Sequence, residues 1–527
     1  MHCSWLACRL LYRPPRVSCS AESTGGRRAL HSLQEGEKLC TVYRRAKSSA
    51  ESTGGRKALQ SLLEGKDLCT VYWRAKSSAE STGGRRALQS LQGGEKLCTV
   101  YWRAKSSAES TGGRRALHSL QQMDSAAENA STTRFRDYLR IRSVQPQPDY
   151  DEIVRFLFKM ADEIGLEKKT LEFSPGRPIV ILTWRGTQPE LKSIILNSHT
   201  DVVPVFEEFW TYPPFAAHKD KNGNIYARGT QDMKSVTIQY LEAIRQLKSE
   251  GRQFLRTIHL TMVPDEEIGG HIGMEIFVDQ PEFRALNPGI TLDEGLANPT
   301  DDFSVFYGEK CVWWITVYCR GDPGHGSRFI ENTAAAKLNS VISSFLGFRE
   351  KEKKRLEDNP GLTLGDVTTI NLTKVSGGVS CNVIPTEMSA TFDLRIPPTV
   401  DLKEFESRIE GWCRAAGDQI SFEYHQKCMN QRMTTPEDSN PWWKAFSDPC
   451  KKLGLKLKPE IFPAATDSRY IRTAGFDALG FSPMNNTPIL LHDHNEYLNE
   501  GIFLHGIQIY TLIIESLASV PPIPGEQ

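Results

Sequence analysis

The chain has 527 residues, of which 39% are hydrophobic and 24% are charged, an ordinary composition for a globular protein with a large core. Its formal net charge is zero, but residues 1–122 carry a net charge of +12 and the remainder a net charge of −12. The basic charges recur with a repeat rather than gathering in one patch, so we expect no nucleic-acid partner. No run of 18 apolar residues is present, so we expect no membrane-spanning helix.

The basic segment is an internal repeat. The unit AESTGGRRALHSLQEGEKLCTVYRRAKSS begins at Ala21 and returns nearly unchanged at Ala50 and Ala79, with a truncated copy at Ala108. Each unit holds too few apolar residues to stack into a continuous core, so we expect residues 1–122 to be disordered. The acid-free opening residues faintly resemble a mitochondrial presequence, which leaves targeting open. The composition of a folded protein begins at Met123.

From residue 123 the pattern alternates between strands and helices. Helical apolar spacing predicts helices at 135–141, 150–165 and 233–250, and apolar β-branched runs predict strands at 178–184, 193–199 and 257–264. This alternation predicts an α/β fold with a substantially parallel sheet. The pattern resumes near the C-terminus and ends in a helix at 501–518.

Between residues 307 and 429 the order of elements changes. Strand 313–319, helix 333–354, strands 367–376 and 387–396, helix 402–417 and strand 420–427 follow one another. This βαββαβ order is typical of a ferredoxin-like α+β unit. We therefore expect a catalytic domain formed by residues 123–306 and 430–527, interrupted by an inserted domain at 307–429.

Acidic and histidine side chains concentrate in five segments: NSHTDVVP (197–204), ARGTQDMKS, VPDEEIGG, TLDEG and LLHDHNE. Each segment has an ordinary alternative explanation. A His-x-Asp pair can lie on the surface, a Glu-Glu pair can be a solvated loop, and Asp232 can cap a helix. Several of the segments follow apolar strands, however, and open α/β sheets place their sites at the carboxyl ends of strands.

The order His-x-Asp, Asp, Glu-Glu, Asp-Glu, His resembles the zinc-dependent family of carboxypeptidases, aminopeptidases, dipeptidases and aminoacylases. Within that family, YARGTQDMK, VPDEEIGGHIGM, LDEGLANPT, PAATDSRYIR and LGFSPMNNTPILLHDHNE are most similar to the cytosolic aminoacylases. The resemblance covers roughly Ser131 to Val520 and excludes the repeats. It implies a mixed-sheet zinc-hydrolase catalytic domain with an inserted ferredoxin-like domain that forms the dimer.

The resemblance implies two zinc ions per subunit, held by five ligands: His199, Asp232, Glu267, Glu294 and His492. A pair of zinc ions needs a bridging carboxylate to offset its repulsion, and the resemblance gives that role to Asp232. His199 and Glu294 would then serve one ion, and Glu267 and His492 the other.

Three further residues would complete the catalytic set: Glu266, Asp201 and His325. Glu266 matches the general base that acts on the zinc-bound water and returns the proton to the departing amine. Asp201 would orient the imidazole of His199. His325, in the inserted domain, matches a histidine that polarises the scissile carbonyl in the partner subunit's site.

The resemblance also implies a set of substrate-binding residues: Asn382, Arg395, Thr466, Asp467 and Arg469. The guanidinium of Arg395 would bind the substrate carboxylate, for which its forked geometry is better suited than lysine. From the residues alone, Arg395 could equally be a salt-bridge partner on a sheet and His325 a loop histidine.

The expected function is hydrolysis of N-acyl-L-amino acids by a cytoplasmic homodimer joined through the inserted domains. The twelve cysteines show no zinc-finger spacing and favour reduced thiols. The nearest alternative is a dipeptidase or carboxypeptidase on the same two-zinc site. An alternative of another class is a non-catalytic scaffold whose functional part is the repeat.

Overall fold

The computed structural model describes residues 41–46, 70–75, 100–104 and 128–526. The chain divides into two compact units, Met1–Asp124 and Ser125–Gln527. The first unit contains the repeats, and the second contains every segment that resembles a zinc hydrolase.

Within the repeats the described residues form three strands, β1 (Thr41–Ala46), β2 (Thr70–Ala75) and β3 (Val100–Ala104). They pair in parallel, and each residue lies opposite its counterpart in the next repeat, as Tyr43 lies opposite Tyr72. The strand sequences TVYRRA, TVYWRA and VYWRA are rich in β-branched and aromatic residues, and nearly identical segments pair readily in register. These three segments therefore differ from the disorder we expected, and the rest of that expectation lies outside the described residues.

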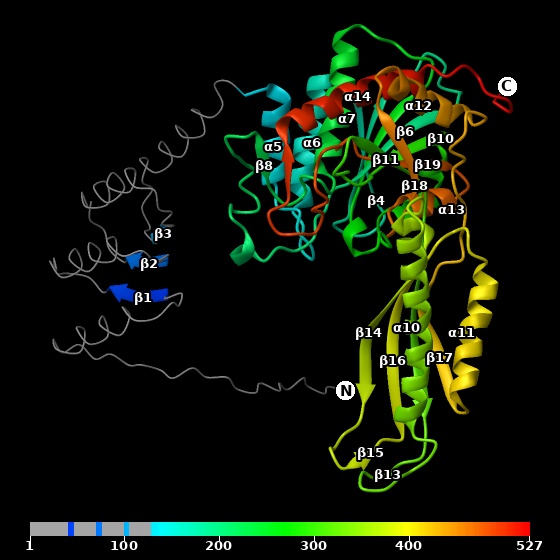
Figure 1. Cartoon of the computed structure of the whole chain (residues 1–527). Coiled ribbons are helices and arrows are strands. Elements are labelled where there is room, and N and C mark those ends of the chain that lie inside the picture. The colour runs from blue at the N-terminus through cyan, green and yellow to red at the C-terminus, as the bar shows by residue number, and fades with distance from the viewer. Residues whose placement is uncertain (1–40, 47–69, 76–99, 105–127, 527) are drawn as a thin grey trace. The chain divides into compact units, whose positions relative to one another are not determined.

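The second unit is built on an eight-stranded sheet with the order β18-β11-β19-β10-β6-β9-β5-β4 (Figure 1). In chain order its strands are β4 (Glu167–Glu172), β5 (Pro178–Trp184), β6 (Ser193–His199), β9 (Ile258–Val263), β10 (Pro288–Asp293), β11 (Asp302–Glu309), β18 (Lys456–Phe462) and β19 (Asp477–Phe481). Strands β19, β10, β6 and β9 run parallel. At one edge, β5 is antiparallel to both β9 and β4; toward the other edge, β11 is antiparallel to β19 but parallel to the edge strand β18. The sheet is mixed with a parallel centre.

Helices cover both faces of this sheet. One apolar core includes Ile194 and Leu196 of β6, whereas Ile195 between them belongs to a second core on the opposite face. The first core contains α5 (Ala130–Arg140), α6 (Tyr150–Ile164), α7 (Lys234–Ser249), α12 (Pro441–Lys452) and α14 (Glu500–Ala518); the second contains α8 (Met274–Val278), α9 (Pro281–Arg284) and α13 (Ser468–Thr473). Burial on both faces explains why the central strands are apolar without alternation.

The inserted domain has its own sheet and core. Strands β12 (Cys311–Arg320), β14 (Thr369–Gly377), β16 (Glu387–Ile396) and β17 (Ile420–Lys427) form an antiparallel sheet with the order β14-β16-β12-β17. Helices α10 (Ala334–Asp358) and α11 (Leu402–Ala416) pack on it. This is the ferredoxin-like βαββαβ arrangement that the sequence predicts. A two-stranded ribbon of β13 (Gly324–His325) and β15 (Val383–Ile384) lies at the far end of the domain from the eight-stranded sheet (Figure 1).

Short elements complete the unit. A three-stranded sheet has the order β20-β8-β7, formed by β7 (His218–Lys219), β8 (Asn224–Tyr226) and β20 (Tyr497–Asn499), and single 3-10 turns lie at Glu207–Phe209, Glu266–Ile268 and Leu364–Asp366. Within the described residues, α14 alone has the length and apolar composition of a membrane span. It packs on α7 and α12 and buries Phe503, Tyr510 and Ile513, as a core helix does.

Candidate metal centre

The candidate site lies at the carboxyl edge of three adjacent strands. His199 is the last residue of β6, Glu294 directly follows β10, and the Glu266–Glu267 pair follows β9. Because β10, β6 and β9 are parallel neighbours in that order, their carboxyl ends meet at one edge. This is the position at which open α/β sheets bind ligands. Two loops complete the site, one before α7 with Asp232 and one between β19 and β20 with His492.

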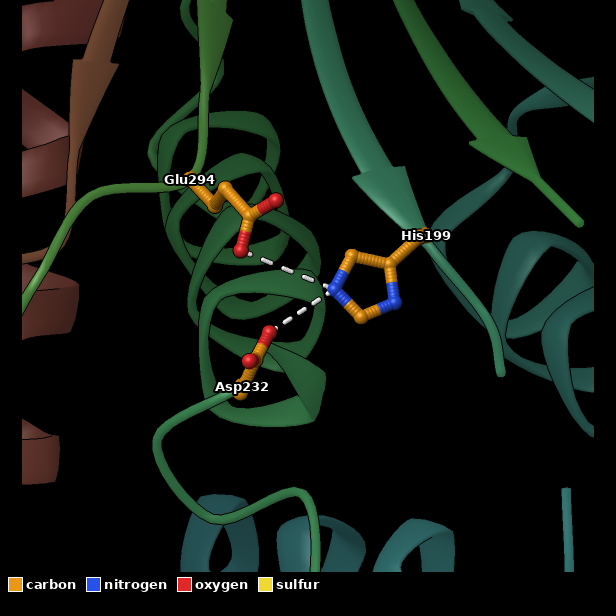
Figure 2. Close-up of side chains that lie close together, drawn as sticks. All are labelled: His199, Asp232 and Glu294. Atoms are coloured by element: carbon orange, nitrogen blue, oxygen red, sulfur yellow. Dashed lines mark hydrogen bonds and ion pairs between the residues drawn. The ribbon is translucent and has the colours of Figure 1, made fainter. Parts of the chain in front are cut away.

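Asp232 joins two clusters of potential metal ligands. Its Oδ1 lies 2.9 Å from His199 Nε2, and Glu294 Oε2 lies 3.6 Å from the same nitrogen. Figure 2 shows these three side chains converging. The other carboxylate oxygen of Asp232, Oδ2, lies 3.2 Å from His492 Nε2, which is 2.9 Å from Glu267 Oε2. The potential ligand atoms within each cluster lie within 4.8 Å of one another, so each can surround one ion.

The charges of this site are compatible with bound cations. Burial raises the pKa of Glu267 to about 7, and burial together with the charge of Asp232 raises the pKa of Glu294 well above its usual range. Hydrogen bonds to Asp232 and Glu267 raise the pKa of His492 to about 10. Glu267 Oε1 is buried and has no hydrogen-bond partner. Bound divalent cations would compensate the charge of these crowded carboxylates. Two imidazoles and three carboxylates are also a donor set that zinc accepts.

The helix-cap alternative for Asp232 does not hold. Helix α7 begins at Lys234, its N-cap residue is Met233, and no side chain caps it. The side chain of Asp232 is buried among the two histidines instead.

Asp201 contacts both the ligand His199 and the turn that carries Glu266 and Glu267. Its carboxylate accepts hydrogen bonds from the backbone N–H groups of Glu266 and Glu267, at 3.2 and 3.3 Å. The Nδ1 of His199 lies 3.0 Å from the backbone carbonyl oxygen of Asp201 and 3.7 Å from its carboxylate. Asp201 therefore holds the Glu266–Glu267 turn, and the nearer contact to the imidazole comes from its backbone. Glu266 is adjacent to the ligands, and burial together with the charge of Glu294 raises its pKa well above the usual range.

A buried network behind Asp201 has no counterpart in the sequence interpretation. Gln145 Nε2 donates to both Asp201 and Asp265, at 2.8 and 2.7 Å. Asp265 also accepts from Tyr150 Oη at 2.7 Å and forms an ion pair with Arg177. The backbone of Asp265 is left-handed, with φ of 63°. The network therefore stabilises an unfavourable turn that directs Glu266 and Glu267 toward the other ligands.

Arg228 and Glu496 form a second unpredicted support. Glu496 Oε2 accepts from Arg228 Nη1 at 2.7 Å, and both side chains are at most 2% exposed. Glu496 also accepts from the backbone N–H groups of Gly229 and Gln231, while Arg228 donates to the carbonyl oxygen of His492. The pair therefore ties the loop of Asp232 to the loop of His492. Arg228 lies in the motif YARGTQDMK and Glu496 in LLHDHNE, and no other feature of the sequence distinguishes them.

The predicted substrate-binding segment Thr466–Arg469 faces the Glu266–Glu267 turn. Arg469 Nη2 donates to the carbonyl oxygen of Gly269 at 2.6 Å. Asp467 is 1% exposed and neither of its carboxylate oxygens has a hydrogen-bond partner. At Gly270, φ is 64° and a Cβ would lie 2.7 Å from Asp467 Oδ1, so this close approach requires glycine.

The structure separates the candidate residues of the inserted domain. His325 lies in the β13–β15 ribbon and Asn382 directly precedes β15; His325 is exposed and its Nδ1 lies 2.8 Å from Ser327 Oγ. Arg395 lies at the other end, opposite Val312 at the start of β12, and forms a two-pronged ion pair with Asp393 at 2.7 and 3.0 Å. Ten residues of β12 span about 33 Å. His325 is therefore remote from the metal centre of its own chain, whereas Arg395 lies at the junction with the catalytic domain.

Residues 195–516 match the family model described as peptidase family M20/M25/M40. The chain belongs to this family. It is 61% identical over 403 residues to Aminoacylase-1 of Mus musculus, a match that covers 76% of this chain and 99% of the mouse protein. Among solved structures, the M20 metallo-carboxypeptidase of Sulfolobus solfataricus is similar in fold, with a TM-score of 0.58 and 19% identity over 74% of this chain and all of that one.

A second solved structure is similar in fold. A dinuclear metal-binding peptidase of the M20 family from Bacillus subtilis is similar with a TM-score of 0.53 and 17% identity, covering 75% of this chain and all of that one. The chain is an amide hydrolase of a metal-dependent family, and its two ligand clusters are a candidate metal centre.

Proposed function

We propose that this chain hydrolyses N-acyl-L-amino acids to a carboxylate and a free L-amino acid, with two zinc ions held by the five ligands. The observation that carries the proposal is the position of Asp232, whose two oxygens each face a different histidine and a different glutamate. The identity to mouse Aminoacylase-1 over nearly its whole length supports this substrate class.

When bound, the zinc ions would supply Lewis-acid activation of a water and of the scissile carbonyl. His199 and Glu294 would hold one ion, Glu267 and His492 the other, and Asp232 both. Glu266 is a half-buried carboxylate next to ligand Glu267 that the ligand set leaves free. It accepts a proton from the attacking water and delivers it to the amine nitrogen as the amide bond breaks.

We assign recognition of the substrate to side chains near the junction of the two domains, among them the arginines Arg395 and Arg469. Arg395 would exchange its intramolecular ion pair with Asp393 for the carboxylate of the substrate, since both are bidentate acceptors. Thr466 and Arg469 lie on the loop that faces the Glu266 turn and would line the same cleft. Loss of Arg395 should therefore raise KM more than it lowers kcat.

The proposed active unit is a homodimer in which His325 serves the partner subunit's site. The position of His325 at the remote end of the inserted domain supports this arrangement, because it cannot contact the ligands of its own chain. In the partner subunit's site, the imidazole of His325 would stabilise the oxyanion that develops on the scissile carbonyl. Asn382, beside the same ribbon, would bind the substrate in that site. A cytoplasmic location is also proposed, supported by the free thiols of the six described cysteines.

The substrate class is tested with N-acetyl-L-methionine and simple dipeptides assayed in parallel on the zinc-loaded protein. The proposal expects higher kcat/KM for the N-acetyl substrate, and a preference for dipeptides would establish the dipeptidase alternative instead. Glu266→Gln should lower kcat by roughly 10²-fold or more while zinc content stays unchanged. Exposed Glu437→Gln is the matched control, and loss of zinc from Glu266→Gln would exchange the roles of Glu266 and Glu267.

The shared site is tested by mixing two inactive variants, His325→Ala and Glu266→Gln. In a mixed dimer one site carries both defects and the other carries neither. Half of the dimers are mixed at equal amounts, so activity should return to about a quarter of that of the wild type. Absence of recovery, with mixed dimers verified by mass, would show that both residues serve one subunit's site.

A further inference from the structure

Two cysteines meet where the inserted domain joins the catalytic domain. Cys311 begins β12 and Cys428 directly follows β17, so they lie on the two chain segments that enter and leave the inserted domain. The Sγ atoms of both cysteines approach the carbonyl oxygen of Asn430, at 3.1 Å for Cys311 and 3.8 Å for Cys428. The two thiols are therefore neighbours.

The backbone geometry is compatible with a bond between them. The N–H of Cys428 donates to the carbonyl oxygen of Val312 at 3.1 Å, which extends the β12–β17 ladder by one pair. Opposite residues of a ladder are about 5 Å apart and successive residues about 3.3 Å, so the Cα atoms of Cys311 and Cys428 lie roughly 6 Å apart. This falls within the range of about 4.4–6.8 Å that disulfides span.

A small basic cavity opens beside Cys428. Its volume is about 30 Å³, and its lining includes Lys310, Arg432 and Arg469. One water molecule needs roughly 10–15 Å³ of such space, so the cavity can hold a molecule of the size of hydrogen peroxide. Lys310 is 2% exposed and its Nζ has no hydrogen-bond partner. A buried, unpartnered ammonium is costly without an acceptor, and this one lies on a cavity that could receive one.

The two thiols are electrostatically unequal. The Cys311 thiol has one hydrogen and two acceptors within reach, the Asn430 carbonyl oxygen and Cys428 Sγ. A hydrogen bond from Cys311 and the charge of Arg469 lower the pKa of Cys428, to about 6, whereas the same contact and burial raise the pKa of Cys311. Cys428 is partly exposed and Cys311 is buried behind it. One thiol is thus suited to attack an oxidant and the other to resolve the product.

We propose that Cys428 and Cys311 form a peroxide-reactive pair that closes to a disulfide across the domain junction. The Cys428 thiolate attacks one oxygen of hydrogen peroxide, forming a sulfenic acid and releasing hydroxide, which takes a proton from solvent to become water. The Cys311 sulfur then attacks the sulfenic sulfur, and a second water leaves with the Cys311 proton. Overall, two thiols lose two electrons to one peroxide, and a dithiol reductant reverses the reaction.

The same domain supplies matched controls. Cys319 and Cys413 are also neighbouring thiols, but both lie in the apolar core and burial raises the pKa of each to about 11. Cys381 is exposed and lies in the loop between β14 and β15. If proximity of two thiols were sufficient for oxidation, Cys319 and Cys413 would also be oxidised. If exposure were sufficient, Cys381 would be oxidised fastest. Our proposal instead expects the fastest oxidation at Cys428.

The test treats the reduced, metal-loaded full chain with hydrogen peroxide and maps the thiols by differential alkylation and peptide mass spectrometry. We expect a Cys311–Cys428 disulfide that dithiothreitol reverses, with Cys428 oxidised about tenfold or more faster than Cys381. Cys311→Ser should leave a sulfenic acid on Cys428 that dimedone traps, and Lys310→Met should slow its formation. In Cys428→Ser, Cys311 should stay reduced.

Two results would overturn the proposal. One is oxidation of Cys428 no faster than that of Cys381, and the other is oxidation of Cys311 at the wild-type rate in Cys428→Ser. Melting temperatures establish that each variant is folded, and Cys428→Ala replaces the serine variant if that one is not. Hydrolysis of N-acetyl-L-methionine is not part of the readout, so this result is independent of the proposed substrate class.

Discussion

Replacement of Glu496 by glutamine tests whether the site depends on the pair that ties its two loops together. The carboxylate of Glu496 accepts from Arg228 Nη1 at 2.7 Å and Gly229 N at 3.1 Å on one oxygen, and from Thr230 Oγ1 at 3.1 Å and Gln231 N at 2.6 Å on the other. Glutamine preserves the shape but replaces one oxygen with an amide nitrogen. Oriented with its oxygen toward Arg228, the amide nitrogen faces the Gln231 N–H, and two donors then meet.

The cost follows from burial. Arg228 is 1% exposed and would lose its counter-charge, while the Gln231 N–H would lose its acceptor, which costs about 1–3 kcal/mol by itself. Breaking a buried ion pair on one side costs about 3–5 kcal/mol in total. A unit of about 400 residues, Ser125–Gln527, has an unfolding entropy of roughly 0.8 kcal/mol/K. Glu496→Gln should therefore lower the melting temperature by roughly 4–6 °C.

The same substitution should weaken the metal centre. Arg228 also donates to the carbonyl oxygen of His492, so a displaced Arg228 disturbs the ligand loops on both sides of Asp232. Loss of such a supporting contact typically costs 10- to 100-fold in metal affinity. Calorimetry measures the melting temperature, and competition with a chromogenic chelator measures zinc affinity, with Glu437→Gln as the exposed control. An unchanged melting temperature together with unchanged zinc affinity would refute the role assigned to this pair.

Three further predictions follow from the fold and the sequence. Glu526 pairs with buried Arg256 through two contacts of 2.7 and 2.8 Å, and this pairing lowers the pKa of Glu526 to about 2. The stabilisation by this ion pair is complete above the ordinary pKa of about 4.5 and is lost as pH falls toward 2. Glu526→Gln should therefore flatten the decline of the free energy of unfolding in urea between pH 5 and 3. An unchanged dependence of that free energy on pH would contradict this role. Removal of metal by a chelator should lower the melting temperature, because cations that bind only the folded site stabilise it, and added zinc should restore it. A chain that starts at Met123 should keep the melting temperature and activity of the full chain, and a marked loss of either would show that the repeats support the enzyme.

The sequence predicted the central elements of the fold well. The expected strands 178–184, 193–199, 387–396 and 420–427 agree residue for residue with β5, β6, β16 and β17. Apolar runs and βαββαβ order are local signals, and local signals are enough to place elements. The order of the strands and the antiparallel pairs β4–β5, β5–β9 and β11–β19 could not be predicted. They depend on which distant segments pair, and the periodicity of the sequence does not encode this.

For the candidate site, the structure tests which side chains lie together, and the roles assigned to them stay predictions. The five potential ligands come together as the resemblance implied, because each follows an apolar strand or lies in a motif with unusual composition. The supporting residues were not found: Gln145, Tyr150 and Arg177 are ordinary residues in ordinary segments. Their function appears only when the fold places them against Asp201 and Asp265, since hydrogen-bond partners 56–120 positions apart leave no local pattern.

The position of the inserted-domain residues has a consequence for how one active site is assembled. His325 and Asn382 lie at one end of β12, and Arg395, Lys310 and Cys428 lie at the other end, a strand length of about 33 Å away. A single copy of the domain cannot present both ends to one metal centre. In the proposed homodimer, residues at the junction would act on the site of their own chain, and residues of the ribbon on the partner's. In such a dimer, motion or cross-linking at the junction would change the proposed carboxylate-binding end in one subunit and move the ribbon proposed to serve the other, so the sheet of the inserted domain would couple the two sites.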